Sequence, residues 1–342
     1  MGLLFPAVLT FSVVVASWAL TGWFLRQALS LQLLDLPNSR SSHVTATPRG
    51  GGAGIVLSTL VAVLVLGWAD RLDWSTVRSL CFGGSLVALI GFVDDRGHVA
   101  RRWRLIGHFV AASWAVATLG GAPPLSAMGF VLDSGWLGFA IATFYLVWML
   151  NLTNFMDGID GIAGVEAVTV CLSMVFLSAI AAPGVHLWIP QLVLASATLG
   201  FLVWNWPPAK IFLGDVGSGF LGLTLATLSL QAAWVVNRLF WSWLVLLGVF
   251  VVDATVTLIR RMAHGERFYD AHRSHAYQHA AVKRGAHMPV TVGVAVINLC
   301  WLLPIAFLIA RGWLDGLLGV LIAYPPLVVA AVRLKAGRPF TV

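Results

Sequence analysis

Eleven long apolar runs divide this chain, and they constrain its fold more than any other feature of the sequence. A transmembrane helix needs about 20 largely apolar residues, and each run comes close to that length. Only 10% of the 342 residues are charged, against about 25% in ordinary soluble domains. The sequence therefore predicts an all-α polytopic membrane protein with a single integral membrane domain over residues 1–342. The predicted spans are 3–25, 52–69, 76–93, 105–120, 136–153, 162–181, 187–204, 217–235, 239–259, 290–310 and 313–332.

Positive charge is distributed unevenly over the loops. The connections after the odd-numbered spans, together with the C-terminal segment, carry seventeen Lys and Arg residues, whereas the other loops carry four. By the positive-inside rule, the loops with seventeen cations face the cytoplasm. We therefore expect a periplasmic N-terminus and a cytoplasmic C-terminus.

Acidic residues gather on the same predicted side, where nine of the fourteen carboxylates lie. A charge at the centre of a membrane helix costs roughly 2.5–3.5 kcal/mol, so several carboxylates gathered at helix ends indicate a function. A hard divalent cation that holds a phosphorylated substrate would supply one. The alternative is that these carboxylates only balance the neighbouring cations.

Two of the acidic motifs lie at the ends of predicted spans. The third span ends in Asp94-Asp95, whose mutual repulsion favours a nearby cation or proton donor, although a solvated helix end is the alternative. After the fifth span, Asn151, Asn154 and Asp157 recur every three residues, as do Asp157 and Asp160. This spacing suits one face of a helix or turn, which could hold the polar groups of a nucleotide and a metal-bound water. A helix C-cap followed by a loop is the alternative.

The connection between the seventh and eighth spans contains Gly214-Asp215-Val216-Gly217-Ser218. These residues open a helix, and the free N–H groups and dipole of a helix start favour a phosphate or a metal-bridged phosphate. Asp215 as a simple N-cap is the alternative.

Two basic segments lie on the predicted cytoplasmic side. His272, Arg273 and His275 fall in the longest loop, where an arginine among histidines favours phosphate recognition. A structural loop and a zinc site are the alternatives. Arg49 precedes three glycines in the first loop, and we expect either a phosphate contact or a flexible connector there.

Taken in order, these motifs resemble those of the polyprenyl-phosphate N-acetylhexosamine-1-phosphate transferases, and are most similar to the bacterial O-antigen-initiating branch. The resemblance implies an inner-membrane enzyme that moves sugar-1-phosphate from a UDP-N-acetylhexosamine to undecaprenyl phosphate and releases UMP. It also implies Mg²⁺ as cofactor, with Mn²⁺ able to substitute, contacts with membrane lipids and no nucleic-acid partner. The resemblance does not decide whether the protein forms a homodimer. It also does not decide whether the lipid phosphate attacks directly or a covalent intermediate forms first.

The resemblance also implies residue roles. The metal ligand would be Asp215, the catalytic residues Asp94, Asp95, Asp157, Asp160 and His275, and the substrate-binding residues Asn151, Asn154, Asn205, Phe212, His272, Arg273 and Arg49. Asn205 and Phe212 fall where the family contacts uridine. Some members place a lysine three residues after the acidic pair, where this chain has His98, so a basic role would pass to Arg96, His98 or Arg101. The pentapeptide-translocase branch has consecutive histidines where this chain has His272-Arg273-Ser274-His275.

Two alternatives belong to other functional classes. An intramembrane prenyltransferase predicts two D-x-x-x-D motifs, and this chain has neither. An ion-coupled transporter predicts carboxylates at span centres, whereas only Glu166 lies well inside a predicted span.

Overall fold

The structure is a computed structural model that describes residues 4–30, 34–35, 46–97, 99–132, 135–266 and 272–339. His98 and Asp270 lie outside the described residues. Each of the eleven predicted spans coincides with a helix or with a broken helix. The helices are α1 (Leu4–Ser30), α2 (Gly52–Trp68), α3 (Trp74–Arg78), η1 (Ser79–Gly83), α4 (Gly84–Arg96), α5 (Arg101–Thr118), α6 (Gly135–Met156), α7 (Ile162–Ala181), α8 (Trp188–Asn205), α9 (Gly214–Val235), α10 (Leu239–Leu246), α11 (Gly248–Ala263), α12 (Ala276–Arg284), α13 (Met288–Ile297), η2 (Asn298–Leu302), α14 (Leu303–Ala310) and α15 (Gly316–Arg333).

Strands are few in the part of the chain that the structure describes. β1 (Leu34–Asp35) pairs with β2 (Thr47–Pro48), and β3 (Leu125–Ala127) pairs with β4 (Phe130–Leu132), both antiparallel. The expected all-α class is confirmed.

Eight of the described helices are long and apolar enough to cross a membrane, or nine if the bent pair α10–α11 forms one span. α2 is shorter, with 17 residues, and α5 carries three arginines in its first turn. The polytopic membrane class is therefore confirmed, whereas the count of eleven spans and the orientation of the termini stay predictions.

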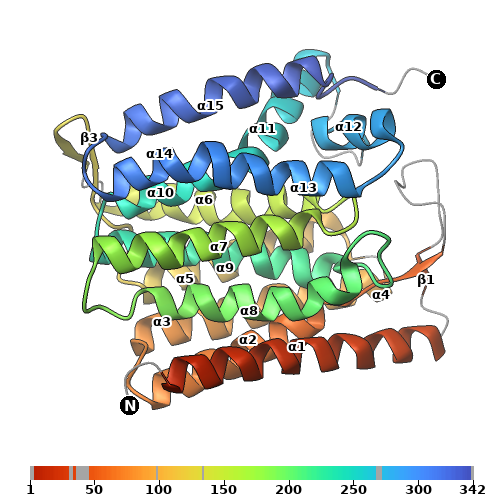
Figure 1. The fold of residues 1–342 in the computed structure, drawn as a ribbon, viewed down its shortest axis with the longest axis horizontal. Coiled ribbons are helices and arrows are strands. Elements are labelled where there is room, and N and C mark those ends of the chain that lie inside the picture. The colour runs from red at the N-terminus through yellow and green to blue at the C-terminus, as the bar shows by residue number, and fades with distance from the viewer. Residues whose placement is uncertain are drawn as a thin grey trace.

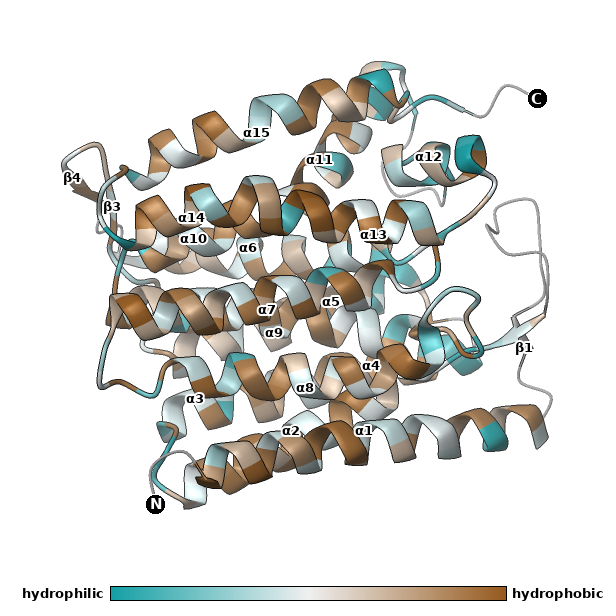
Figure 2. Cartoon of the chain, viewed as in Figure 1, coloured by the Kyte–Doolittle hydropathy of each residue, from teal (hydrophilic) through white to brown (hydrophobic). Residues whose placement is uncertain are grey.

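The helices run roughly parallel along the long axis of the molecule, with α1 beginning at the left and α15 ending at the right in Figure 1. Apolar residues cover the lengths of the helices, and hydrophilic residues gather in the segments at the right-hand end in Figure 2. The start of α9, the end of α4 and helix α12 all lie toward that end. We call it the polar end of the bundle.

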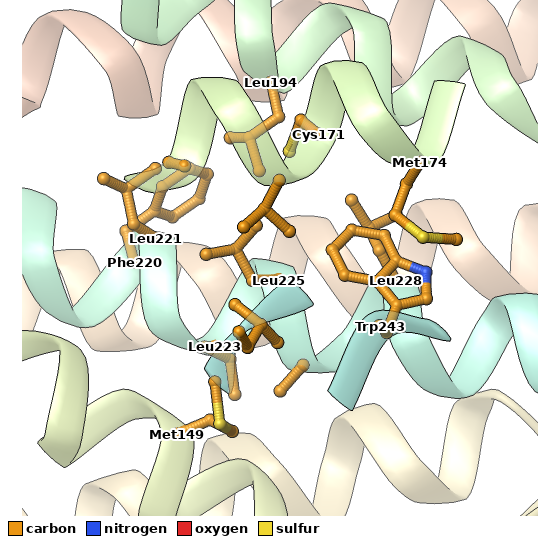
Figure 3. Packing of buried hydrophobic residues seen from close by; sticks show 14 of the residues in the cluster. Met149, Cys171, Met174, Leu194, Phe220, Leu221, Leu223, Leu225, Leu228 and Trp243 are labelled. Carbon is orange, nitrogen blue, oxygen red and sulfur yellow. The ribbon is translucent and has the colours of Figure 1, made fainter. Parts of the chain in front are cut away.

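Helix α9 forms the centre of the bundle, because every residue from Val216 to Ala233 is buried. Glycines let its neighbours approach closely: a Cβ added at Gly222 would lie 2.6 Å from the carbonyl oxygen of Met149 in α6. Figure 3 shows the packing around Phe220 and Leu225 of α9, with Cys171 and Met174 of α7 and Trp243 of α10. A central helix packed along its whole length holds its first turn, and therefore Asp215, in one position.

Two buried acidic side chains lie within the helices. Glu166 in α7 accepts a hydrogen bond of 2.7 Å from Nδ2 of Asn298 in η2. Asp253 in α11 is also buried, at 5% exposure. Asp253 lies within the predicted span 239–259, and α11 continues past it to Ala263. The expectation that only Glu166 lies well inside a span stays a prediction.

Candidate active site

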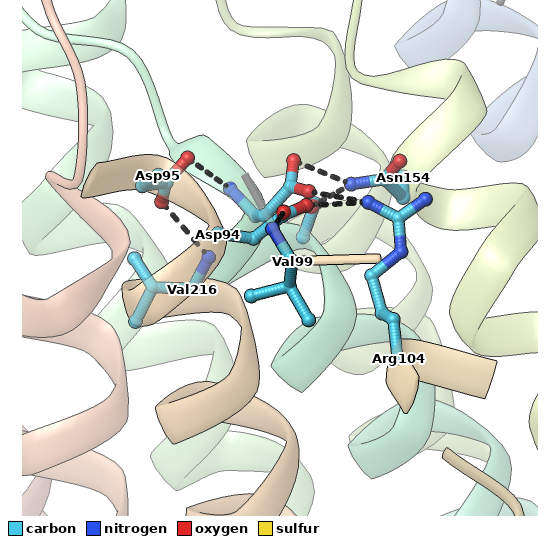
Figure 4. A network of polar contacts seen from close by, with 8 residues as sticks. Asp94, Asp95, Val99, Arg104, Asn154 and Val216 are labelled. Atoms are coloured by element: carbon cyan, nitrogen blue, oxygen red, sulfur yellow. Dashed lines mark hydrogen bonds and ion pairs between the residues drawn. The ribbon is translucent and has the colours of Figure 1, made fainter. Parts of the chain in front are cut away.

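Asp95, at the end of α4, caps the beginning of α9. Its carboxylate accepts hydrogen bonds from the backbone amides of Asp215, at 3.1 Å, and Val216, at 3.2 Å (Figure 4). These amides belong to the first turn of α9, where helix N–H groups have no partner within the helix. Gly91 makes the approach possible, since a Cβ there would collide with the backbone of Asp215.

Asp94 turns instead toward α5. One carboxylate oxygen accepts a hydrogen bond of 2.9 Å from the backbone amide of Val99, and the other pairs with Nη1 of Arg104. The same Nη1 lies 3.3 Å from Oδ2 of Asp215, so Arg104 bridges two carboxylates from different helices (Figure 4).

Arg104 is therefore a basic residue beside the acidic pair, and the sequence analysis did not name it. Arg96 lies with its guanidinium 4.1 Å from the centre of the Phe92 ring. The signal for Arg104 is its spacing from Arg101 and His108, three and four residues apart, which places polar side chains on one face of an apolar helix.

Asn154 joins α6 to the same cluster. Its Nδ2 donates to Oδ1 of Asp215 and to Oγ of Ser218, each at 2.9 Å. The N-x-x-N-x-x-D and G-D-x-G-S segments thus meet, as their shared side of the membrane predicted. Asn151 lies one turn deeper in α6, where its Nδ2 donates to the carbonyl of Val147.

Asp157 follows the end of α6, and its surroundings shift the pKa of its carboxyl strongly. Burial raises the pKa of its carboxyl well above the ordinary value. The negative charge of Asp215 raises this pKa further, and the positive charge of Arg49 lowers it. Asp157 therefore lies close enough to Asp215 and Arg49 for both charges to act on it.

The first loop reaches the site by pairing with the segment before α9. Phe212 donates its backbone amide to the carbonyl of Pro48 at 2.8 Å, and Gly51 donates to Phe212 at 2.9 Å. At Gly52, a Cβ would collide with the backbone of Gly217. The glycines after Arg49 therefore serve a close approach, rather than the flexible connector weighed from the sequence.

Asp160 and Asn205 hold loops together. Asp160 accepts from the backbone amide of Ala209 at 3.1 Å, and its Oδ2 lies 3.1 Å from Nδ1 of His287. Asn205, at 4% exposure, accepts from the amide of Gly161 at 2.9 Å and donates to the carbonyl of Ile211 at 2.8 Å. These contacts fix the loops on both sides of the site, and the substrate roles expected for both residues stay predictions.

The histidine segment docks on the end of α6 through α12. Asp253 accepts from the backbone amides of Ala276, at 2.9 Å, and Tyr277, at 3.0 Å, which open α12. The hydroxyl of Tyr277 donates to the carbonyl of Phe155 at 2.9 Å, two residues before Asp157. The sequence analysis missed the positioning contacts of Asp253 and Tyr277, because they depend on how α6, α11 and α12 pack.

Within this segment, His275 is buried at 3% exposure, with its Nδ1 3.4 Å from Oδ1 of Asp253. The His272 ring stacks on it with centroids 4.9 Å apart. Burial lowers the pKa of His272 to about 3, so its imidazole is neutral at physiological pH. His272 therefore offers a phosphate no positive charge, whereas the guanidinium of Arg273 is a cation.

A pocket opens between α4, α5, α6 and α9 beside the acidic cluster. Its polar lining is Arg104, His108, Asn151, Asn154 and Asp215. His108 was not named from the sequence. Val87 and Leu150 supply apolar lining, and Gly91 and Gly219 leave room between the helices.

These carboxylates could bind a hard cation whose remaining ligands are oxygens of a substrate. Among the residues that the structure describes, no three His, Cys, Asp or Glu side chains converge to hold a metal by themselves. Mg²⁺ commonly keeps several waters and binds one or two carboxylates together with substrate phosphates. Asp215 and Asp157 fit that mode, since burial and then the negative charge of Asp215 raise the pKa of Asp157, and a bound cation would offset both effects.

Comparison with known proteins relates this chain to one family. A family model described as glycosyl transferase family 4 matches residues 77–233. A probable undecaprenyl-phosphate N-acetylglucosaminyl 1-phosphate transferase of Bacillus subtilis is 27% identical over 257 residues, which cover 74% of this chain and 70% of the relative. A decaprenyl-phosphate N-acetylglucosaminephosphotransferase of Mycobacterium tuberculosis is 28% identical over 304 residues, 79% of this chain and 74% of the relative. A phospho-N-acetylmuramoyl-pentapeptide-transferase of Streptococcus gordonii is 32% identical over 232 residues, 64% of this chain and 68% of the relative.

Proposed function

Because this chain belongs to glycosyl transferase family 4, the polyprenyl-phosphate N-acetylhexosamine-1-phosphate transferases, we propose that it transfers N-acetylhexosamine-1-phosphate from a UDP-sugar to undecaprenyl phosphate. One observation carries the proposal: Asp215 receives hydrogen bonds from Asn154 of α6 and Arg104 of α5, while Asp95 of α4 caps its helix. Four distant segments thus form one anionic cluster that could hold a divalent cation, and Arg104 beside it could contact a phosphate.

The electrostatic obstacle in this reaction is the approach of two anions. Mg²⁺ bound by Asp215, with Asp157 nearby, would neutralise charge on the diphosphate. Arg104 and Arg49 lie beside these carboxylates and add positive charge of their own. Arg273 would contact the diphosphate from the docked histidine segment.

The bond changes follow from the products. An oxygen of the lipid phosphate attacks the β-phosphorus of the UDP-sugar, the bond from that phosphorus to the bridging α–β oxygen breaks, and UMP leaves with that oxygen. The pair of Asp94 and Arg104 would orient the attacking phosphate. We favour direct attack over a covalent phospho-aspartate, and a burst of one UMP per enzyme without acceptor would contradict it.

The finer assignments are also proposals. We propose a UDP-N-acetylhexosamine as donor, the bacterial inner membrane as location, and the initiation of O-antigen or another cell-envelope polysaccharide as the pathway. The separated histidines of His272-Arg273-Ser274-His275 support the O-antigen-type branch over the pentapeptide branch.

UMP release by the purified protein in detergent tests the proposal. The assay supplies Mg²⁺, undecaprenyl phosphate and, in turn, each of a panel of UDP-N-acetylhexosamines. Asp215→Asn is the test variant, and Asp73→Asn, at an exposed carboxylate before α3, is the matched control. We expect UMP only with acceptor, metal and Asp215. Silence with every donor from folded protein would overturn the proposal.

A further inference from the structure

We propose that His108 is a substrate-binding residue, and that the pocket it lines receives the phosphate head of the polyprenyl acceptor. This inference rests on the proposed function and assigns one substrate to one part of the site.

His108 is buried without a complete set of partners. It is 6% exposed, and its Nδ1 finds no hydrogen-bond partner among the described residues. A buried polar atom left unpaired costs about 1–3 kcal/mol, and proteins pair nearly all such atoms. His108 also lines the pocket, so a ligand that enters the pocket could supply a partner that the imidazole lacks.

The position of the pocket favours the acceptor over the donor. On α5, His108 lies one turn further into the bundle than Arg104, and on α6 Asn151 lies one turn further in than Asn154. Asp215 opens α9, whereas Gly219, which also lines the pocket, lies one turn inside it. The pocket therefore extends from the carboxylates toward the apolar middle of the bundle.

The pocket offers a ligand both charged or polar groups and apolar side chains. Arg104 supplies a cation, and the side chains of Asn151 and His108 supply further hydrogen-bonding groups. Val87 and Leu150 supply the apolar part of the pocket lining. A phosphate carried by a long apolar chain matches this combination, whereas a nucleotide diphosphate is polar over its whole length.

Steady-state kinetics with each substrate varied in turn test the assignment. We expect His108→Ala to raise KM for the lipid phosphate by about tenfold or more, the loss of one hydrogen bond to a charged group. The KM for the UDP-sugar should stay within about twofold. His108→Gln retains a hydrogen-bonding amide and should restore most of the acceptor affinity. His186→Ala, in the loop before α8, is the matched control and should change neither constant.

Each other outcome rejects the assignment. A raised KM for the donor alone would place the sugar or nucleotide in the pocket, and unchanged constants would make His108 a structural core residue. Thermal unfolding of each variant in detergent verifies folding. If His108→Ala fails to fold, His108→Gln and His108→Asn carry the comparison.

Direct binding separates this inference from the proposed function. A short-chain prenyl phosphate and UMP are titrated separately against the wild type and His108→Ala by calorimetry. If the wild type binds the prenyl phosphate without turnover and the variant binds it tenfold more weakly, the subsite stands and the reaction falls. If the wild type turns over and both proteins bind the prenyl phosphate equally, the reaction stands and the subsite falls.

Discussion

The carboxylate of Asp95 accepts a hydrogen bond of 3.1 Å from the backbone amide of Asp215, 120 residues later in the chain. This contact joins the acidic pair of α4 to the first turn of the central helix. Asp95 and Asp94 therefore have different contacts: Asp95 positions the helix that carries Asp215, and Asp94 pairs with Arg104.

The capping contact predicts a stability effect at Asp95. Loss of a helix N-cap costs about 0.5–2 kcal/mol, so Asp95→Ala should lower Tm in detergent by several degrees. Asp73→Ala is the control, because Asp73 precedes α3 without a side-chain capping hydrogen bond and should leave Tm nearly unchanged. Equal Tm values for the two variants would contradict the capping role.

The position of Arg104 predicts an effect on activity. Arg104→Ala leaves the carboxylates of Asp94 and Asp215 without their shared guanidinium, and we expect kcat/KM to fall by roughly tenfold to a hundredfold. Arg96→Ala removes a cation stacked on Phe92 and should cost far less. The prediction fails if Arg96→Ala is as damaging as Arg104→Ala.

The electrostatics of Asp157 predict opposite effects on stability and activity. Its raised pKa means that the folded state holds the proton more tightly than the unfolded state. Stability is therefore lost as pH rises from the ordinary carboxyl pKa, about 4, through the folded value. Asp157→Asn should raise Tm at pH 8 without Mg²⁺, leave Tm little changed below pH 4, and lower kcat by roughly a hundredfold or more. A lower Tm at pH 8 would show that the carboxylate stabilises the fold.

The pairing of Glu166 with Asn298 predicts a ranking of variants. Oε1 of Glu166 and Oδ1 of Asn298 are both buried and have no partner among the described residues. Glu166→Gln can retain the acceptor that Asn298 now uses and also offers an N–H donor. Glu166→Ala removes that acceptor and leaves Nδ2 of Asn298 with Oγ1 of Thr169, at 2.8 Å, as its partner. We expect Glu166→Gln to keep Tm near that of the wild type and Glu166→Ala to lower it. The reverse order would contradict the pairing.

The helices and the clustering of motifs could be predicted from the sequence, because hydropathy and loop charge are local properties of the chain. The meeting of Asn154 with Asp215 followed from motifs placed on one side of the membrane. The choice of Arg104 over Arg96 did not follow, because it depends on which face of α5 packs against α4. Asp253 illustrates the same limit: its contact with the start of α12 arises only from tertiary packing.

The central claim is that a whole sugar-1-phosphate moves to the lipid, and a labelled donor tests it most directly. A UDP-N-acetylhexosamine that supports UMP release is prepared with ³²P in the β-phosphate only, and lipid and nucleotide products are separated after turnover. The account predicts that the label enters the lipid fraction and that the released nucleotide is unlabelled UMP. Sugar in the lipid with the label retained in UDP, or no labelled lipid from protein that forms UMP, would contradict it.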